Sequence, residues 1–131
     1  MLSLHLKRFA CDAGEAEARR VAQHVQLPRS LSLVAYATPC CAQRTSTYAL
    51  FGLVAHSGRS GCGHYTSYVQ PCPAASQLDA ALGTSLPAGG FLCFDDEECS
   101  SVSADELASD FSPASRSAAL ACLCFYRAVD E

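Results

Sequence analysis

The chain has 131 residues, the length of one domain, and its hydrophobic content of 50% with 17% charged residues excludes an intrinsically disordered protein. The formal net charge is −4 and no basic run exceeds two residues, so the sequence argues against nucleic acid as a partner.

The nine cysteines bear on the expected compartment. No secretory signal precedes them, because residues 1–8 are too short and too polar for the apolar core of a signal peptide. No apolar run is long enough to cross a bilayer, so no membrane partner is expected. We expect an intracellular protein, in the cytoplasm or the nucleus, in which most cysteines are small buried hydrophobic residues. A disulfide framework is the alternative, and it would leave one thiol over.

Metal binding is disfavoured by the spacing of these cysteines. The sequence has no C-x-x-C pair, and Cys40 and Cys41 are adjacent, which suits no usual tetrahedral zinc site. We therefore expect no metal and no other cofactor.

Alternating apolar and polar residues predict strands in the first third of the chain. Residues 2–9 alternate strictly and predict a half-buried strand, in which Arg8 is interpreted as a sheet-edge charge. Residues 10–20 are small and charged and predict a hairpin loop. Residues 21–25 fit either a helix or a strand, and we favour a strand that ends before a proline. Residues 31–36 predict a short extended segment.

The middle of the chain predicts an antiparallel pair of strands. Residues 48–56 form a long apolar run that indicates a buried strand, with Gly52 at a bulge or a close-packing site. Residues 57–63 are rich in glycine and predict a turn, after which residues 64–69 form the partner strand. Residues 70–90 predict a loop, which we interpret as a tolerated insertion because structureless loops of that length are uncommon inside domains.

The last third predicts two further strands and a helix. The strands are expected at residues 91–94 and 119–127. Between them, Ser103 and Glu106 have the spacing of a capping box and predict the start of a short helix. Strands outnumber helices throughout, so the predicted fold class is α+β, with a mainly antiparallel sheet and short helices.

His64 and Asp95 form a candidate catalytic pair. A strand start beside a glycine-rich turn holds an imidazole rigidly and lets a substrate backbone come close. Asp95 would accept the Nδ1–H of His64, as the third member of a nucleophile–base–acid triad does. Strand alternation lets only one of Asp95 and Asp96 face the imidazole, and spacing alone does not choose between them. Alternatively, residues 95–98 form a solvated acidic turn. His56 is interpreted as a hydrogen-bonded structural residue.

Five blocks of sequence span nearly the whole chain: LHLKRF (4–9), YALFGLVAHSG (48–58), GHYTSYV (63–69), FLCFDDE (91–97) and CFYR (124–127). Together, and in this order, they resemble the second half of the catalytic domain of ubiquitin-specific proteases. The resemblance implies a papain-like cysteine protease fold, of which residues 1–131 would be the C-terminal palm half that bears the His and the Asp.

The resemblance also implies an activity: thiol-dependent hydrolysis of the peptide or isopeptide bond after the C-terminal glycine of ubiquitin. The partner would be ubiquitin or a ubiquitinated protein. His64 would be the general base, Asp95 its orienting acid, and Asp96 a neighbouring acid that supports the site. The turn at 57–63 would be a mobile loop that closes over ubiquitin's tail, with Tyr65 as a wall of the slot. The implied substrate-binding residues are Ser57, Gly58, Gly61, Gly63 and Tyr65.

The family's nucleophile has no counterpart in these residues. The family carries its cysteine upstream in a Gly-Asn-Thr-Cys-type segment, whose Asn donates to the oxyanion, and this chain contains no Asn. Cys62 lies two positions before His64, but two residues on one backbone segment rarely reach attack geometry. Phe91 stands where the family usually has Trp, which keeps a hydrophobic plug and loses the indole N–H.

We therefore expect the nucleophilic cysteine, and the N-terminal half of the catalytic domain, in sequence upstream of these residues. The 131 residues alone are expected to have no hydrolase activity, because both the thiolate and the oxyanion donor are lacking. Two alternatives stay open. One is a pseudo-protease that binds ubiquitin and has lost its nucleophile, and the other is a partial chain without independent function.

Overall fold

The structure, a computed structural model, describes residues 1–14, 17–38, 47–71, 86–115 and 117–129. Its elements in chain order are β1 (Leu2–His5), β2 (Phe9–Ala10), β3 (Arg19–Arg20), β4 (Ser30–Ser32), the 3-10 helix η1 (Val34–Tyr36), β5 (Thr47–Arg59), β6 (Cys62–Val69), β7 (Phe91–Asp95), β8 (Glu98–Val102), α2 (Ala104–Asp110) and β9 (Leu120–Ala128). None of the described helices is both long enough and apolar enough to cross a membrane.

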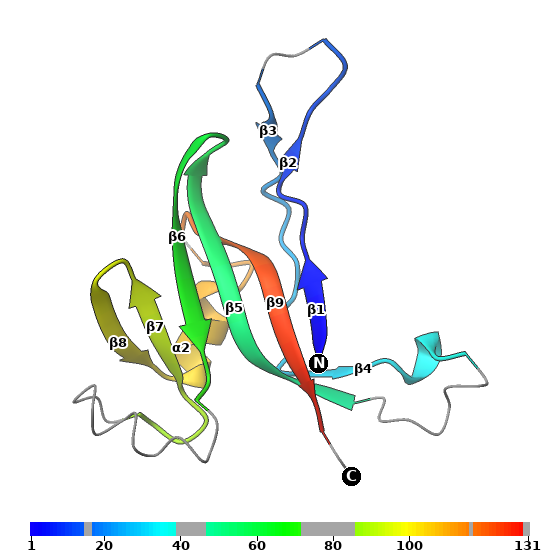
Figure 1. Ribbon diagram of the computed structural model, residues 1–131, viewed down its shortest axis with the longest axis vertical. Helices are drawn as coiled ribbons and strands as arrows, with labels where there is room; N and C mark the ends of the chain where they lie inside the picture. Colours follow the sequence, from blue (N-terminus) through cyan, green and yellow to red (C-terminus); the bar gives the residue numbers. More distant parts are fainter. Residues whose placement is uncertain (15–16, 39–46, 72–85, 116, 130–131) are drawn as a thin grey trace.

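One antiparallel sheet dominates the molecule. Its strands follow the order β1-β9-β5-β6-β7-β8, and β4 pairs with β5 beside this path (Figure 1). A separate two-stranded sheet, β2-β3, projects beyond the end of β1 (Figure 1). The mainly antiparallel α+β class predicted from the sequence is confirmed. The two central strands, β5 and β6, are joined by a hairpin, and that hairpin carries most of the predicted site.

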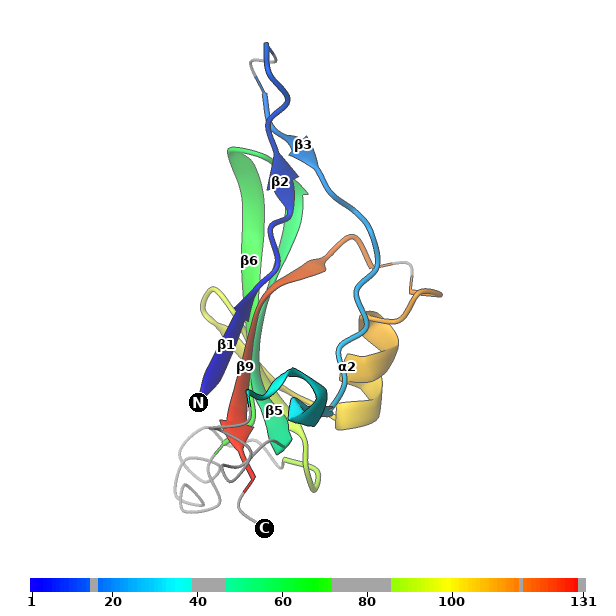
Figure 2. The same ribbon diagram turned by 90° about the vertical axis from the view of Figure 1, so that its right-hand side faces the viewer.

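The hydrophobic core lies between the sheet and a layer made of α2 and the chain that leads from β3 to β4. Figure 2 shows both parts of that layer on the same side of the sheet. The largest side chains of the core are fully buried. One of them, Tyr126, donates a hydrogen bond from its hydroxyl to the carbonyl oxygen of Pro28, at 3.1 Å. The core is formed by Leu50, Leu53, Phe91, Ala104, Leu107, Ala121, Cys124 and Tyr126.

Two local predictions on these elements are confirmed. The register of β5 against β9 shifts between Leu50 and Gly52, which is the predicted irregularity at this glycine. A Cβ at Gly52 would lie 3.3 Å from a ring carbon of Phe125, so the missing side chain makes room for that ring. α2 begins with a complete capping box, in which Ser103 and Glu106 each bond the other's backbone N–H.

The predicted strand over residues 2–9 is interrupted, because Arg8 is buried rather than at a sheet edge. Its side chain is 6% exposed and donates from Nε to the carbonyl oxygen of Ala121, at 2.8 Å. It also donates to the carbonyl oxygens of Val21 and Gln23. The strand predicted over 21–25 is therefore wrong, since carbonyl groups that a strand would pair with its neighbour accept from this guanidinium instead.

Two further segments differ from the prediction, and one is largely untested. Residues 31–36 are divided between β4 and η1. Residues 98–102, for which no strand is predicted from the sequence, form the edge strand β8. The predicted loop 70–90 is described only at its two ends, and residues 72–85 lie outside the described residues. The predicted strands at 91–94 and 119–127 are confirmed as β7 and β9, each within one residue.

Candidate active site

The fold brings His64 on β6 into contact with Asp95 at the end of β7. The two strands pair in antiparallel fashion, with Ser67 opposite Phe94, so the end of β7 lies near the start of β6. His64 meets Asp95 through its Nε2 atom and the Oδ1 atom of the carboxylate. The expectation that Asp95 would bond Nδ1 is wrong, because the opposite ring nitrogen faces it.

This contact assigns the basic atom of the imidazole. An ionised carboxylate only accepts hydrogen bonds, so Nε2 of His64 is the donor toward Asp95. In the neutral ring the lone pair then lies on Nδ1. The His64 side chain is 44% exposed, so the ring lies at the surface rather than in the core.

Asp96 approaches the other side of the same ring. Its Oδ2 atom lies 3.9 Å from Nδ1 of His64, which is beyond hydrogen-bond distance but within the range of an ion pair. The expectation that only one of Asp95 and Asp96 could face His64 is wrong. Asp96 is not on the strand: it lies in the turn between β7 and β8 with a φ of 50°, so strand alternation no longer directs its side chain.

The two carboxylates favour the protonated imidazole. The hydrogen bond and the charge of Asp95 raise the pKa of His64, desolvation works against this rise, and the charge of Asp96 adds to it. Among the described residues, His64, Asp95 and Asp96 also have the geometry of a possible metal-binding group, since one ligand atom from each lies within 4.8 Å of the others. All three side chains are already engaged with each other as an imidazole flanked by two acids.

The glycine-rich hairpin is tighter than the sequence suggests. β5 continues through Arg59 and β6 begins at Cys62, so the ladder includes the pairs Ser57↔His64 and Gly58↔Gly63. The predicted turn over 57–63 is therefore reduced to residues 60 and 61. Glycine makes this possible, since a Cβ at Gly58, whose φ is +101°, would lie 2.8 Å from the carbonyl oxygen of Cys62.

The expected substrate-binding residues divide between two faces of this hairpin. Directly paired residues share a face and successive residues alternate. Ser57 and His64 therefore lie on one face, and Tyr65 lies on the other, beside His56, with ring centroids 4.7 Å apart. Tyr65 is 60% exposed, so it is available to a partner, but it does not share a face with the imidazole of His64.

Comparison with known proteins identifies the family. The model of the family "ubiquitin carboxyl-terminal hydrolase" matches residues 1–126. This chain belongs to that family. It is 35% identical over 94 residues to ubiquitin carboxyl-terminal hydrolase 16 of Danio rerio, and 36% identical over 94 residues to ubiquitin carboxyl-terminal hydrolase 45 of Mus musculus. Each match covers 68% of this chain and 11% of the relative, so the chain corresponds to a small part of these proteins.

Solved structures show the same fold. The chain is similar to the SAGA Ubp8/Sgf11/Sus1/Sgf73 DUB module with a TM-score of 0.68 and 23% identity, over 98% of this chain and 23% of that one. A SAGA DUB module bound to monoubiquitin gives a TM-score of 0.68 at 22% identity, over 98% and 23% of the two chains. The predicted papain-like fold of a ubiquitin-specific protease catalytic domain is thereby confirmed.

The cysteines of this family member are free thiols wherever the structure describes them. They are Cys11, Cys62, Cys93, Cys99, Cys122 and Cys124. The disulfide framework is therefore excluded for these six. Burial raises the pKa of Cys124 to about 11, and desolvation also raises the pKa values of Cys93 and Cys122, so these thiols are poor nucleophiles. Cys124 is buried, Cys93, Cys99 and Cys122 are half-buried, and Cys11 and Cys62 are exposed, so full burial, expected for most cysteines, holds for one of these six.

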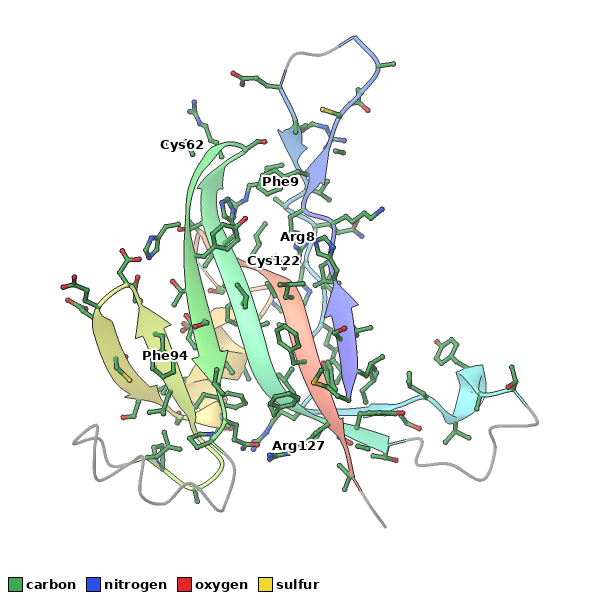
Figure 3. All side chains as sticks on the ribbon, in the orientation of Figure 1. Arg8, Phe9, Cys62, Phe94, Cys122 and Arg127 are labelled. Carbon is green, nitrogen blue, oxygen red and sulfur yellow. The ribbon has the colours of Figure 1, made fainter. Side chains whose placement is uncertain are left out.

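Cys62 lies at the tip of the β5–β6 hairpin (Figure 3). Within the described part of the chain, the side chains that shift the pKa of His64 are Asp95 and Asp96, and no described thiol is bonded to it. Among the six described cysteines, none is therefore seen hydrogen-bonded to His64 as an attacking thiol would be.

His56 and Arg20 are site neighbours that the sequence did not identify. His56 is 5% exposed, and its Nδ1 atom has no hydrogen-bond partner among the described residues, so the expected hydrogen bond is not seen at this atom. Arg20 donates from NH2 to the backbone carbonyl oxygen of His56, at 3.0 Å. No local sequence pattern predicts the contacts of His56 and Arg20, because these contacts depend on how the small sheet β2-β3 packs against β5.

Proposed function

We propose that residues 1–131 are the base-bearing, C-terminal part of the catalytic domain of a thiol-dependent deubiquitinase. The observation that carries the proposal is the contact between His64 and Asp95, which lie 31 positions apart in a chain of the ubiquitin carboxyl-terminal hydrolase family. An imidazole oriented by a carboxylate is the part of a cysteine protease that prepares a thiol for attack.

In the proposed reaction, His64 moves protons through its Nδ1 atom. A cysteine thiol from upstream sequence gives its proton to Nδ1, and Asp95 stabilises the imidazolium through Nε2. The thiolate attacks the carbonyl carbon of ubiquitin's C-terminal glycine, and the protonated Nδ1 delivers its proton to the leaving amine, which leaves a thioester. A water then gives a proton to Nδ1 and attacks the thioester, and the proton returns to the departing thiolate.

Ubiquitin is the proposed partner, and its Gly-Gly tail is proposed to pass along the β5–β6 hairpin. Gly58 supports this role, because it lies in the ladder beside Ser57, the register partner of His64, and carries no side chain, whereas the space at Gly63 is filled by the His56 ring. Ser57, Gly61 and Tyr65 complete the proposed substrate-binding set. A structural neighbour bound to monoubiquitin supports the choice of partner.

The nucleophile and the N-terminal half of the domain are proposed to come from sequence upstream of these residues. The 131 residues alone are then inactive. A reducing compartment, the cytoplasm or the nucleus, is proposed because the six described cysteines are free thiols.

The test is hydrolysis of ubiquitin that carries a fluorescent leaving group at its C-terminus, by the full polypeptide that contains this segment. His64→Ala should lower kcat by about 10³-fold or more, and Asp95→Asn by about 10²- to 10⁴-fold. His24→Ala is the matched control, since His24 is exposed and bonds the carbonyl oxygen of Phe111 near α2. An active polypeptide that tolerates His64→Ala refutes the proposed base. An inactive polypeptide that still binds ubiquitin supports the pseudo-protease alternative.

A further inference from the structure

The small sheet β2-β3 is attached to the central strand β5 at His56. Phe9 and Arg20 are register partners in that small sheet. The Phe9 ring meets the His56 ring edge-on, with centroids 5.3 Å apart and an interplanar angle of 81°. Arg20 binds the backbone of the same residue, since NH2 donates to the His56 carbonyl oxygen. One cross-strand pair thus holds both the side chain and the backbone of His56.

On the side away from the small sheet, His56 contacts β6, the strand that carries the candidate base His64. Its register partner on β6 is Tyr65, the residue after His64, and the two rings are tilted with centroids 4.7 Å apart. A Cβ at Gly63, the residue before His64, would overlap the His56 ring. The next residue on β5, Ser57, is the register partner of His64 itself. His56 therefore touches the strand on both sides of His64.

The contacts of the His56 side chain are packing contacts. Nδ1 is buried without a hydrogen-bond partner among the described residues, which carries a free-energy cost that a phenyl ring would avoid. The ring is held instead by Phe9, Tyr65 and the bare backbone of Gly63. Figure 3 shows Phe9 between β2 and the top of the β5–β6 hairpin, where it closes this stack.

We propose that His56 is a positioning residue, which couples the position of the β2–β3 hairpin to the position of the His64 backbone. The inference rests on the proposed function and goes beyond it, because it assigns a role to a residue that touches neither the reacting atoms nor the carboxylates. Its ring fixes Gly63 and Tyr65, and through them the backbone that carries the imidazole. A displacement of Phe9 in the β2–β3 hairpin therefore shifts the His56 ring, and with it the backbone that carries His64.

The kinetic test uses the full polypeptide and three variants. His56→Ala removes the ring and should lower kcat by about 10- to 100-fold, since small misplacements of a catalytic group have effects of this size. His56→Phe restores a ring of similar shape and should recover kcat to within about 3-fold. Leu107→Ala is the control: Leu107 is buried on α2, away from the hairpin, so its loss should lower Tm while kcat stays within about 3-fold.

The outcome that overturns the proposal is a His56→Ala variant whose kcat, measured well below Tm, equals that of Leu107→Ala. A His56→Phe variant as slow as His56→Ala also overturns it, because the function would then depend on the ring nitrogens rather than on packing. In His56→Phe, the acid limb of the pH profile of kcat/KM should stay at its wild-type position, since the His64–Asp95 contact is unchanged in this variant.

Hydrogen exchange measured by mass spectrometry tests the coupling without activity. His56→Ala should speed amide exchange both in residues 9–20 and in residues 62–66, whereas Leu107→Ala should leave both segments unchanged. Unchanged exchange in residues 9–20 of His56→Ala overturns the coupling. If the wild-type polypeptide lacks hydrolase activity, the proposed function fails, and this measurement alone decides whether His56 links the two hairpins.

Discussion

His64 and Asp95 lie 31 positions apart in the sequence and meet through Nε2 and Oδ1 in the structure. The contact is produced by one antiparallel pair of strands, because β6 carries the imidazole and β7 ends at the carboxylate. The imidazole and the carboxylate therefore belong to a single structural unit, whose geometry is set by the ladder between neighbouring strands.

The first prediction concerns the pKa of His64. Asp95→Asn should lower this pKa more than Asp96→Asn, because the hydrogen bond and charge of Asp95 are the leading causes of the rise. NMR titration of the His64 ring in the two variants measures both shifts. Equal shifts, or a larger shift in Asp96→Asn, would contradict the assigned contacts.

The same rise has a consequence for stability and pH. The pKa of His64 is higher in the folded protein than the value of about 6.5 expected in the unfolded chain. The pair's contribution to the free energy of unfolding is therefore complete below the unfolded pKa and is lost as pH rises through the folded pKa. The difference in free energy of unfolding between wild type and Asp95→Asn should therefore shrink as pH rises from 5 to 9. Denaturant unfolding of the two proteins measures this difference.

The second prediction concerns the acid limb of kcat/KM. Nδ1 must be unprotonated to accept a thiol proton, so the raised pKa of His64 shifts the acid limb to higher pH. Asp95→Asn should shift that limb to lower pH while it reduces the maximum rate. Rates measured across pH 5 to 9 check this, and a limb that stays in place in Asp95→Asn contradicts the role of Asp95.

The pairing of His64 with an acid at the end of the next strand was predictable from residue types and strand positions, whereas the choice of Asp95 over Asp96 came from the family resemblance. The ring nitrogen that faces Asp95 was not predictable, since it depends on the side-chain rotamer. Asp96 was misjudged because strand alternation stops at a turn, and its φ of 50° directs it back to the imidazole. The strand expected at 21–25 failed because a buried Arg8 takes the carbonyl oxygens of Val21 and Gln23.

The third prediction compares two glycines of the β5–β6 hairpin. Gly63→Ala places a methyl group on the His56 ring and 2.6 Å from the carbonyl oxygen of Ser57, so backbone must move. Gly61→Ala meets nothing within 4 Å and suffers only from its φ of +73°. We expect a loss of about 3 kcal/mol or more for Gly63→Ala and about 1 kcal/mol for Gly61→Ala. Urea unfolding measures both, and a reversed order refutes the close approach at Gly63.

The fourth prediction concerns the buried cation Arg8. Arg8→Met removes three hydrogen bonds and leaves the carbonyl oxygen of Ala121 without its buried partner, which should cost about 3 kcal/mol of stability. Arg19→Met is the matched control, because Arg19 is exposed and lies 3.9 Å from Asp12, a pair worth about 0.5 kcal/mol or less. Thermal unfolding distinguishes the two, and equal losses would mean that Arg8 contributes no more than a surface charge.

The fifth prediction concerns the cap of α2. Ser103→Ala removes the side-chain acceptor for the Glu106 N–H and should destabilise the protein by about 1 kcal/mol. The hydrogen bond from the Ser103 backbone lowers the pKa of Glu106, so its contribution is present above the unfolded pKa and is lost as pH falls. Ser101→Ala, at an exposed position of β8, is the control. A Ser103→Ala loss that equals this control contradicts the cap.

The most direct measurement is labelling of the full polypeptide with ubiquitin that carries a thiol-reactive group at its C-terminus. The account predicts labelling at a cysteine upstream of residue 1, a large loss of labelling in His64→Ala, and no labelling of the 131 residues alone. Labelling at Cys62 or at any other of the nine cysteines in this chain, or undiminished labelling in His64→Ala, would contradict it.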